Sequence, residues 1–176
     1  MKPAVTARVL LCVFAATIAA GCGSGADTWA IRPDGRIGPL QIDVSTESDV
    51  RDFAGTPFKV EEVFSPAKKG AVGHELYYRC GDRCLTTYAI AYSTRKLSDF
   101  HTESARFATE RGSHVGMLAT HAASAERRKI VGACGEGHAI ELRRDEHHVF
   151  ALGVFERKVS LIAYLGPHTL SYEDLC

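Results

Sequence analysis

Cysteine is the most reactive residue type in this 176-residue chain, and Cys22 is the most informative of the six. It follows an uncharged and mostly apolar run at residues 9–20, which itself follows the basic residues Lys2 and Arg8. A basic start followed by an apolar stretch of about this length is typical of a secretory signal, and the stretch is shorter than the roughly 20 residues of a membrane span. The sequence therefore predicts an exported chain that is cleaved close to Cys22.

Residues 19–22, Ala-Ala-Gly-Cys, resemble the lipobox of bacterial lipoproteins, with Ala19 where that family prefers leucine. The resemblance implies that the chain is cut before Cys22 and that this cysteine is lipidated. Residues 1–21 are then the signal peptide, and residues 22–36 are the lipidated cysteine with a flexible tether. The alternative is an ordinary secretory signal with Cys22 as an incidental thiol. On the lipoprotein interpretation, the protein lies outside the cytoplasm, anchored by its lipid to the cell membrane or the outer membrane.

Four cysteines remain once Cys12 and Cys22 are assigned to the signal and the lipid: Cys80, Cys84, Cys134 and Cys176. An even number in an exported chain favours two disulfides, for which three connectivities exist. Cys80 and Cys84 flank a Gly-Asp-Arg turn between two β-rich segments, where facing residues lie about 5 Å apart. We therefore expect Cys80–Cys84, which leaves Cys134–Cys176. The alternative is a zinc site with four thiolates, although only one of the pairs is closely spaced.

The eight histidines show no spacing that indicates a metal or catalytic site. His147 and His148 are adjacent, so in a strand their side chains point to opposite faces. The chain has no Gly-x-Ser-x-Gly segment, and the glycine-rich residues 132–138 lack the Lys-Ser/Thr pair of a phosphate-binding loop. We therefore expect a protein that is not an enzyme and that holds neither a metal nor a cofactor.

The charge balance gives no reason to expect a nucleic-acid partner. The chain has 21 basic and 21 acidic residues, and removing the signal with Lys2 and Arg8 leaves 21 − 2 = 19 basic residues against 21 acidic ones. A mature chain with a charge near −2 lacks the positive surface that binds phosphate backbones.

Tyrosine and arginine cluster on two neighbouring predicted strands. The residues that we expect to contact a protein partner are Tyr77, Arg79, Tyr88 and Tyr92. Tyrosine and arginine are enriched where protein interfaces hold most of their binding energy. Tyr78 alternates in step with Leu76 and is instead expected in the core.

Two segments have the pattern of short helices, and each precedes β-type sequence. In the first segment Ser45 is the expected N-cap, Val50 and Phe53 have helical spacing, and Gly55 ends the helix. The second helix is expected within residues 115–129. Alternation predicts strands at residues 74–80, 85–92, 97–100, 138–144, 148–156 and 158–165, and residues 58–72 are expected to include an exposed loop.

In both halves of the chain a predicted short helix is followed by predicted strands. The segment "YAIAYSTRKLS" from Tyr88 also matches "FALGVFERKVS" from Phe150. We therefore expect an α+β fold of two tandem repeats, each with short helices packed on an antiparallel sheet of three to four strands. The first repeat spans residues 37–102, and the second repeat with its tail spans residues 103–176. The alternative is a chance similarity, since strand patterns are common.

Residues 43–57, "DVSTESDVRDFAGTP", resemble the start of small SmpA/BamE-like domains, and residues 115–123, "VGMLATHAA", keep the Gly-Met pair of that motif. Asp43 stands where the motif has glycine. The resemblance implies helix-plus-sheet units, often found on lipoproteins. Two such units in tandem form the beta-lactamase inhibitory protein architecture, in which the sheet binds a partner enzyme.

These observations lead to an expected function as a non-enzymatic lipoprotein of the cell envelope. Its sheet is expected to bind another envelope or secreted protein, or to support envelope assembly. The alternatives are a lipoprotein that binds a small ligand or a cell-wall fragment in a pocket between the halves and, less favoured, an unrecognised hydrolase.

Overall fold

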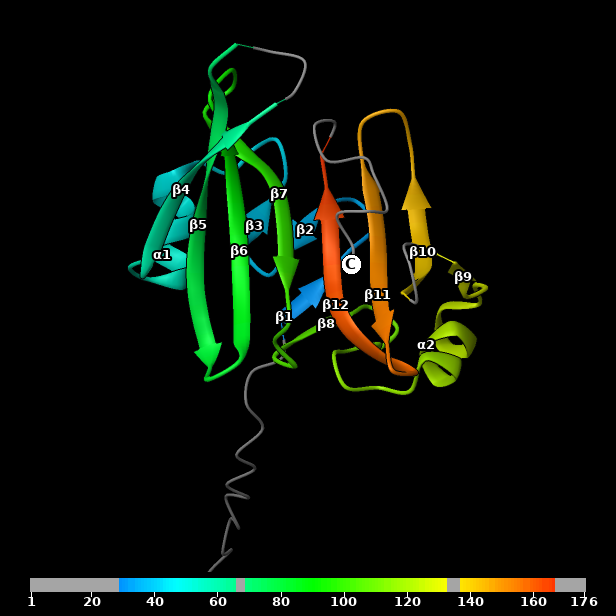
Figure 1. Ribbon diagram of the computed structural model, residues 1–176. Coiled ribbons are helices and arrows are strands. Elements are labelled where there is room, and N and C mark those ends of the chain that lie inside the picture. Colours follow the sequence, from blue (N-terminus) through cyan, green and yellow to red (C-terminus); the bar gives the residue numbers. More distant parts are fainter. Residues whose placement is uncertain (1–28, 66–68, 133–136, 167–176) are drawn as a thin grey trace, which may run out of the picture.

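The computed structural model describes residues 29–65, 69–132 and 137–166. In these residues eight strands form one antiparallel sheet in the order β4-β5-β6-β7-β12-β11-β10-β9, and four short strands form a second sheet in the order β3-β2-β1-β8 (Figure 1). The large sheet consists of β4 (Lys59–Phe64), β5 (Ala71–Gly81), β6 (Cys84–Ala91), β7 (Lys96–Thr102), β9 (Val131–Gly132), β10 (His138–Arg144), β11 (Val149–Phe155) and β12 (Lys158–Leu165). The remaining elements are β1 (Trp29–Ile31), β2 (Arg36–Ile37), β3 (Leu40–Gln41), β8 (Phe107–Thr109), α1 (Glu47–Ala54) and α2 (Ala119–Glu126).

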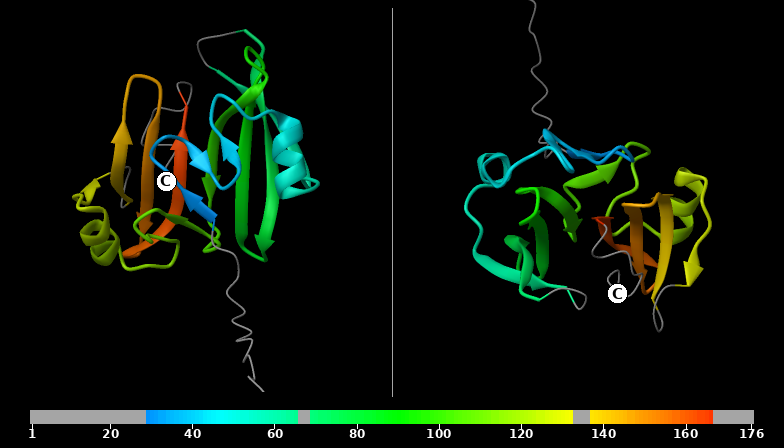
Figure 2. Two further views of the ribbon diagram at one scale, coloured as in Figure 1. Left: turned by 180° about the vertical axis from the view of Figure 1, so that it is seen from behind. Right: turned by 90° about the horizontal axis from the view of Figure 1, so that it is seen from above.

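The main core lies on one face of the large sheet, and a smaller buried cluster that includes Ala151 and Ala163 lies on the other face. The face of the main core is covered by α1 and the small sheet (Figure 2), and Ala119 and Ala122 of α2 join the same core. Alternation along the strands supplies the core side chains, because successive residues of a strand point to opposite faces. In the β5–β6 pair Leu76 lies opposite Tyr88, and both are buried on the core face.

Helix α1 begins one residue later than the sequence predicts. Thr46, and not Ser45, is the N-cap, because its hydroxyl accepts a hydrogen bond from the Asp49 N–H while the Asp49 carboxylate accepts one from the Thr46 N–H. The Ser45 hydroxyl instead accepts a hydrogen bond from the Gln41 N–H at 2.9 Å. Gly55 ends the helix at φ 85°, a left-handed backbone angle that glycine adopts without strain.

The expected fold class, two repeats that each pack short helices on a small sheet, is wrong. The structure is mostly strands, with two helices and one large sheet, because β7 and β12 pair directly in antiparallel register. Neither half therefore has a sheet of its own. Each helix has only eight residues and buries few side chains: Val50 in α1, and Ala119 and Ala122 in α2. Helices this short cover only part of the large sheet, so the small sheet covers much of the remaining core face.

The strands predicted from alternation are confirmed as β5, β6, β7, β10, β11 and β12. Residues 58–72, which were expected to include an exposed loop, begin with β4 and end at the start of β5, and residues 66–68 between these strands lie outside the described residues. Residues 29–31 fall in the expected tether of residues 22–36, and they form β1, which pairs with β8 in parallel. No helix among the described residues is long and apolar enough to cross a membrane.

Candidate protein-binding face

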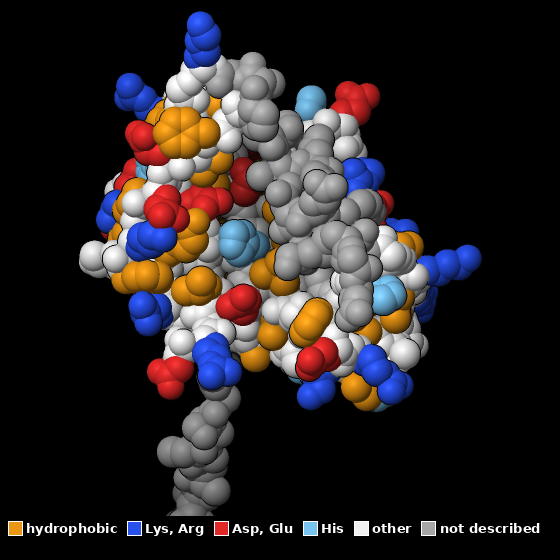
Figure 3. Space-filling model, in the orientation of Figure 1, with side chains coloured by type: hydrophobic (Ala, Val, Ile, Leu, Met, Phe, Trp, Pro, Cys, Tyr) orange, Lys and Arg blue, Asp and Glu red, His pale blue; other side chains and the backbone are white. Residues whose placement is uncertain are grey.

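The face of the large sheet opposite α1 carries polar and aromatic side chains over β4 to β7. We call this surface the front face, and Figure 3 looks directly onto it. Strand register places Lys59, Tyr77, Thr87 and His101 side by side in one row across the four strands, which we call the Tyr77 row. In Figure 3, hydrophobic side chains alternate with acidic and basic ones over the left part of this face. Such a mixture of residue types is common on protein-binding surfaces.

A stacked cluster of aromatic and cationic side chains lies where β4 begins. The Arg79 guanidinium carbon is 4.6 Å from the centre of the Phe58 ring, and Lys59 Nζ is 5.3 Å from the centre of the Tyr77 ring. The two rings are 6.5 Å apart at 64°, in an edge-to-face arrangement. Phe58 is 47% exposed, and Arg79 is exposed as well. Cation–π contacts hold these side chains in place, so less freedom is lost when a partner binds.

The acidic groups near Tyr77 are already paired within the described chain. The Tyr77 hydroxyl donates a hydrogen bond to Glu75, and Glu61 forms an ion pair with Lys59 at 2.6 Å. Burial, together with the Glu75 and Glu61 carboxylates, raises the pKa of Tyr77 well above its ordinary value of 10.0. Tyr77 therefore keeps its proton at neutral pH and acts as a hydrogen-bond donor.

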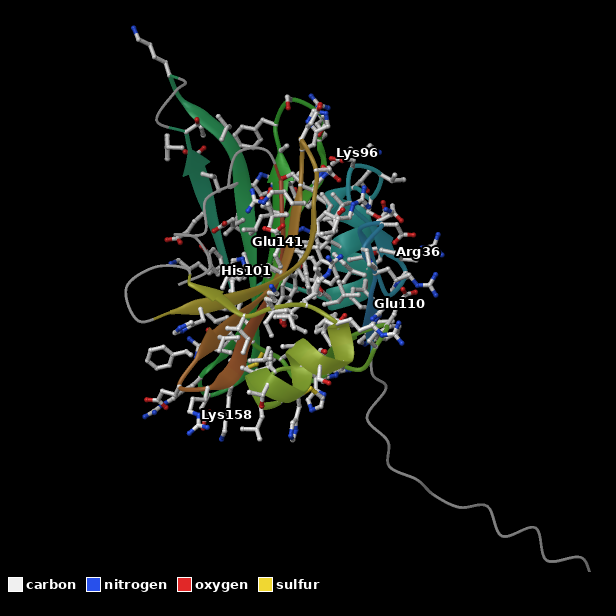
Figure 4. The ribbon with its side chains drawn as sticks, turned by 90° about the vertical axis from the view of Figure 1, so that its right-hand side faces the viewer. Arg36, Lys96, His101, Glu110, Glu141 and Lys158 are labelled. Carbon is white, nitrogen blue, oxygen red and sulfur yellow. A yellow bond between two sulfur atoms is a disulfide. The ribbon has the colours of Figure 1, made fainter. Side chains whose placement is uncertain are left out.

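The middle of the front face is polar. Thr87 is 1% exposed, and its hydroxyl has no hydrogen-bond partner within the described residues. Burial lowers the pKa of His101, although the carboxylates of Glu75, Asp99 and Glu103 oppose this shift. His101 is therefore neutral at pH 7, and it lies on the front face, on the other side of the sheet from Arg36 and Glu110 (Figure 4).

Of the four residues expected to bind a partner, the structure brings only Tyr77 and Arg79 together. Tyr88 is 1% exposed and lies in the core, with its ring 5.1 Å from that of Phe100, so the prediction that it contacts a partner is corrected. Tyr92 is 44% exposed, but it packs against His74, which lies on the core face in register with Ile90. Because side chains alternate between the two faces along β5 and β6, Tyr77 lies on the front face and Tyr88 lies on the core face.

Phe58 is the member of the cluster that the sequence analysis missed. It lies in the segment expected to include a loop, and its approach to Arg79 depends on the pairing of β4 with β5. The sequence did contain an indication of this position. Phe58 directly follows the Gly-x-Pro segment that ends the helix, and it precedes residues that alternate as in a strand.

The disulfide next to the cluster joins the expected pair, Cys80 and Cys84, whose α-carbons are 5.0 Å apart. Gly81 pairs with Cys84, which leaves Asp82 and Arg83 as the turn of the hairpin. The crosslink follows Arg79 directly and so holds the end of β5 against β6. Two joined sulfurs are not available as zinc ligands. Cys22, Cys134 and Cys176 lie outside the described residues.

No group of three or more metal-ligand side chains is present in the described parts of the chain. A hollow of about 470 Å³ is present, a size that suits small ligands. It lies beside α2 and the β11–β12 turn, and not between the two halves as the small-ligand alternative expected. Its lining includes Leu118, Ile130, His138, Phe155 and Arg157.

Comparison with known proteins assigns no family to the chain. No family model matches it, and no curated protein matches it. An extracellular protein containing an SCP domain from Bacillus anthracis str. Ames is similar in structure, with 8% sequence identity and a TM-score of 0.45. The alignment covers 71% of this chain and 44% of that protein, so the match involves less than half of the neighbour's length. At this similarity no activity, ligand or partner carries over from that protein.

Proposed function

We propose that this protein is an exported, lipid-anchored, non-enzymatic protein that binds another protein through its front face. The observation that supports this most is the stacked cluster of Phe58, Tyr77 and Arg79 at the β4 side of the sheet. Aromatic residues and arginine dominate the binding energy of protein interfaces, and here Phe58 and Arg79 are exposed beside the half-buried Tyr77.

The strand next to this cluster is open to a partner. β4 is the terminal strand of the large sheet, and all of its residues except Val63 are exposed. A terminal strand presents backbone N–H and C=O groups that can pair with an extended segment of another chain. The occupant that we propose is therefore an extended segment of the partner protein, which adds to β4.

The chemistry of the cluster indicates that this segment carries an acidic side chain. Within the described chain no carboxylate pairs with the Arg79 guanidinium, whereas Glu61 pairs with Lys59 and Glu75 accepts from Tyr77. A guanidinium binds a carboxylate through two parallel hydrogen bonds, which fixes the orientation of the partner. The proposed partner contact is thus a carboxylate on Arg79, with apolar contact to Phe58.

Two further observations support export and anchoring of the chain. Residues 1–22 have the order of a lipoprotein signal, and the Cys80–Cys84 disulfide suits an oxidising location outside the cytoplasm.

The test uses a photo-crosslinking amino acid in place of Phe58, in the full lipoprotein in its native membranes. The expected result is a discrete crosslinked product that Arg79→Ala reduces by roughly tenfold, as the loss of one interface hot spot would do. The matched control places the crosslinker at Tyr92, which is similarly exposed but lies away from the Tyr77 row. Equal products at the two positions, or a product that Arg79→Ala leaves unchanged, would refute the proposed site.

The anchor has its own test. Cys22→Ser should move the protein from the membrane fraction to the soluble fraction. A variant that stays in the membrane would show that the lipid on Cys22 is not the anchor.

A further inference from the structure

Two large apolar side chains are exposed close together at one end of the molecule. Phe155, the last residue of β11, is 57% exposed, and Leu118, the N-cap of α2, is 44% exposed. An isolated antiparallel β-bridge between Leu118 and Lys158 holds the start of α2 against the β11–β12 turn. Both residues line the hollow of about 470 Å³, whose lining is mostly apolar.

Basic side chains flank this apolar surface. Arg157 lines the same hollow and Lys158 follows it, with Glu156 as the acidic residue of the turn. Glu156 and Arg157 have φ values of 48° and 65°, so the backbone turns tightly and Phe155 stands beside a projecting tip. Exposed apolar residues next to basic ones are typical of surfaces that contact the interface of a bilayer.

The same end of the molecule holds the start of the described chain. Figures 1 and 2 show the beginning of β1, helix α2 and the β11–β12 turn at one end, and Figure 4 labels Lys158 there. Trp29 is 29 − 22 = 7 residues after Cys22. Seven residues span at most about 25 Å when fully extended. A lipid on Cys22 would therefore hold this end of the molecule next to the bilayer.

We infer that this end is a membrane-contact surface, on which Phe155 and Leu118 enter the lipid interface beside Arg157 and Lys158. The occupant of the hollow is then the lipid of the bilayer that holds the anchor. The inference depends on the lipid anchor of the proposed function and is independent of the protein partner. In Figure 1 the β11–β12 turn lies at this end and the two strands run away from it, so the front face lies to the side of the proposed contact surface.

The test measures fluorescence quenching in the full lipoprotein, reconstituted in vesicles of phosphatidylcholine and phosphatidylglycerol with a shallow nitroxide-labelled lipid. Trp29, the single tryptophan of the chain, is first replaced by Phe to remove its signal. Phe155→Trp then introduces a reporter at the proposed surface, and Phe64→Trp provides the matched control. Phe64 is 64% exposed and ends β4, and this end of the strand lies at the opposite end of the molecule from α2 (Figure 1).

The expected result is strong quenching of the Phe155→Trp reporter and little quenching of the Phe64→Trp reporter, since interfacial side chains lie roughly 5–10 Å into the boundary of the acyl chains. In the unlipidated Cys22→Ser form, Phe155→Ser should lower the partition coefficient into the same vesicles by about tenfold, the change expected from losing roughly half of a buried phenylalanine's transfer free energy. Thermal unfolding shows that each variant is folded, and Leu118→Trp serves as a second reporter.

Equal quenching of the two reporters would overturn the inference. Protection of the Phe155→Trp reporter from aqueous iodide without quenching by the labelled lipid would overturn it as well, and would indicate that protein covers the hollow. Mass analysis of the N-terminal peptide shows whether Cys22 carries a lipid, and so distinguishes failure of the contact surface from failure of the anchor. A chain without lipid on Cys22 refutes the anchor, whereas a lipidated chain with equal quenching refutes only the contact surface.

Discussion

Replacing Tyr88 by alanine tests the assignment of this residue to the core. Tyr88 is 1% exposed, and its ring lies 5.5 Å from that of Tyr78 and 5.1 Å from that of Phe100. Truncating a large buried aromatic side chain to alanine costs roughly 3–5 kcal/mol, and a pair of packed rings is worth roughly 0.5–1.5 kcal/mol beyond its buried area. Because Tyr88 takes part in two such pairs, we expect Tyr88→Ala to lower the free energy of unfolding by about 4 kcal/mol.

The matched control is Tyr77→Ala, on the opposite face of the same pair of strands. Tyr77 is half-buried, and its hydroxyl contacts Glu75 at the surface, so we expect a loss of about 1 kcal/mol or less. The same substitution is expected to weaken the crosslink to the partner, which Tyr88→Ala should affect only through instability.

Urea unfolding of the unlipidated chain, followed by far-ultraviolet circular dichroism with the disulfide intact, gives both free energies of unfolding. The slope of the free energy against urea concentration should stay the same across the three proteins, because the same surface is exposed on unfolding. A loss of about 1 kcal/mol or less for Tyr88→Ala, or equal losses for the two variants, would refute the assignment of these tyrosines to opposite faces.

Three other predictions follow from local contacts. Burial lowers the pKa of His101 below the ordinary 6.5, so the unfolded chain takes up its proton first and stability should fall as the pH drops below about 6.5. His101→Gln should flatten this decline in urea titrations at several pH values, and an unchanged slope would contradict the prediction. Replacing Cys80 and Cys84 together by serine should cost about 2 kcal/mol, because the crosslink closes a short loop, and a shifted urea midpoint measures this cost. Thr46→Ala removes the hydroxyl that caps α1 and should cost about 1 kcal/mol, with a lower melting temperature; an unchanged one would argue against the cap.

The strands that alternation predicted were found, but their assembly was not predictable from the same pattern. Residues 138–144 and 158–165 alternate in a way that identifies each as a strand, and both are strands in the structure. Alternation does not identify the neighbour of a strand. β12 was expected to belong to a separate second sheet, yet Ala163 lies opposite His101 of β7, so that the two halves share one sheet. The small sheet was missed because its strands have only two or three residues, too few for a period to be visible.

In the candidate site, too, some features could be predicted from the sequence and others depend on strand pairing. Tyr77 and Arg79 lie on one face because they are two residues apart in one strand. This spacing can be read from the sequence alone. The burial of Tyr88 depends on its register with Leu76, and the contact of Phe58 with Arg79 depends on the pairing of β4 with β5.

The sequence by itself determined the features that depend on residues within a few positions of each other. These are the positions of most of the longer strands, the end of α1 at Gly55, and the closeness of Cys80 to Cys84 across a short turn. Only the tertiary structure decided which strands meet, and thus which side chains share a surface. The physical reason is that strand pairing at long range, such as Trp29 with Phe107, is selected by the burial of the whole core. No local pattern encodes that burial, so the separation of Tyr77 from Tyr88 became visible only once the strands were paired.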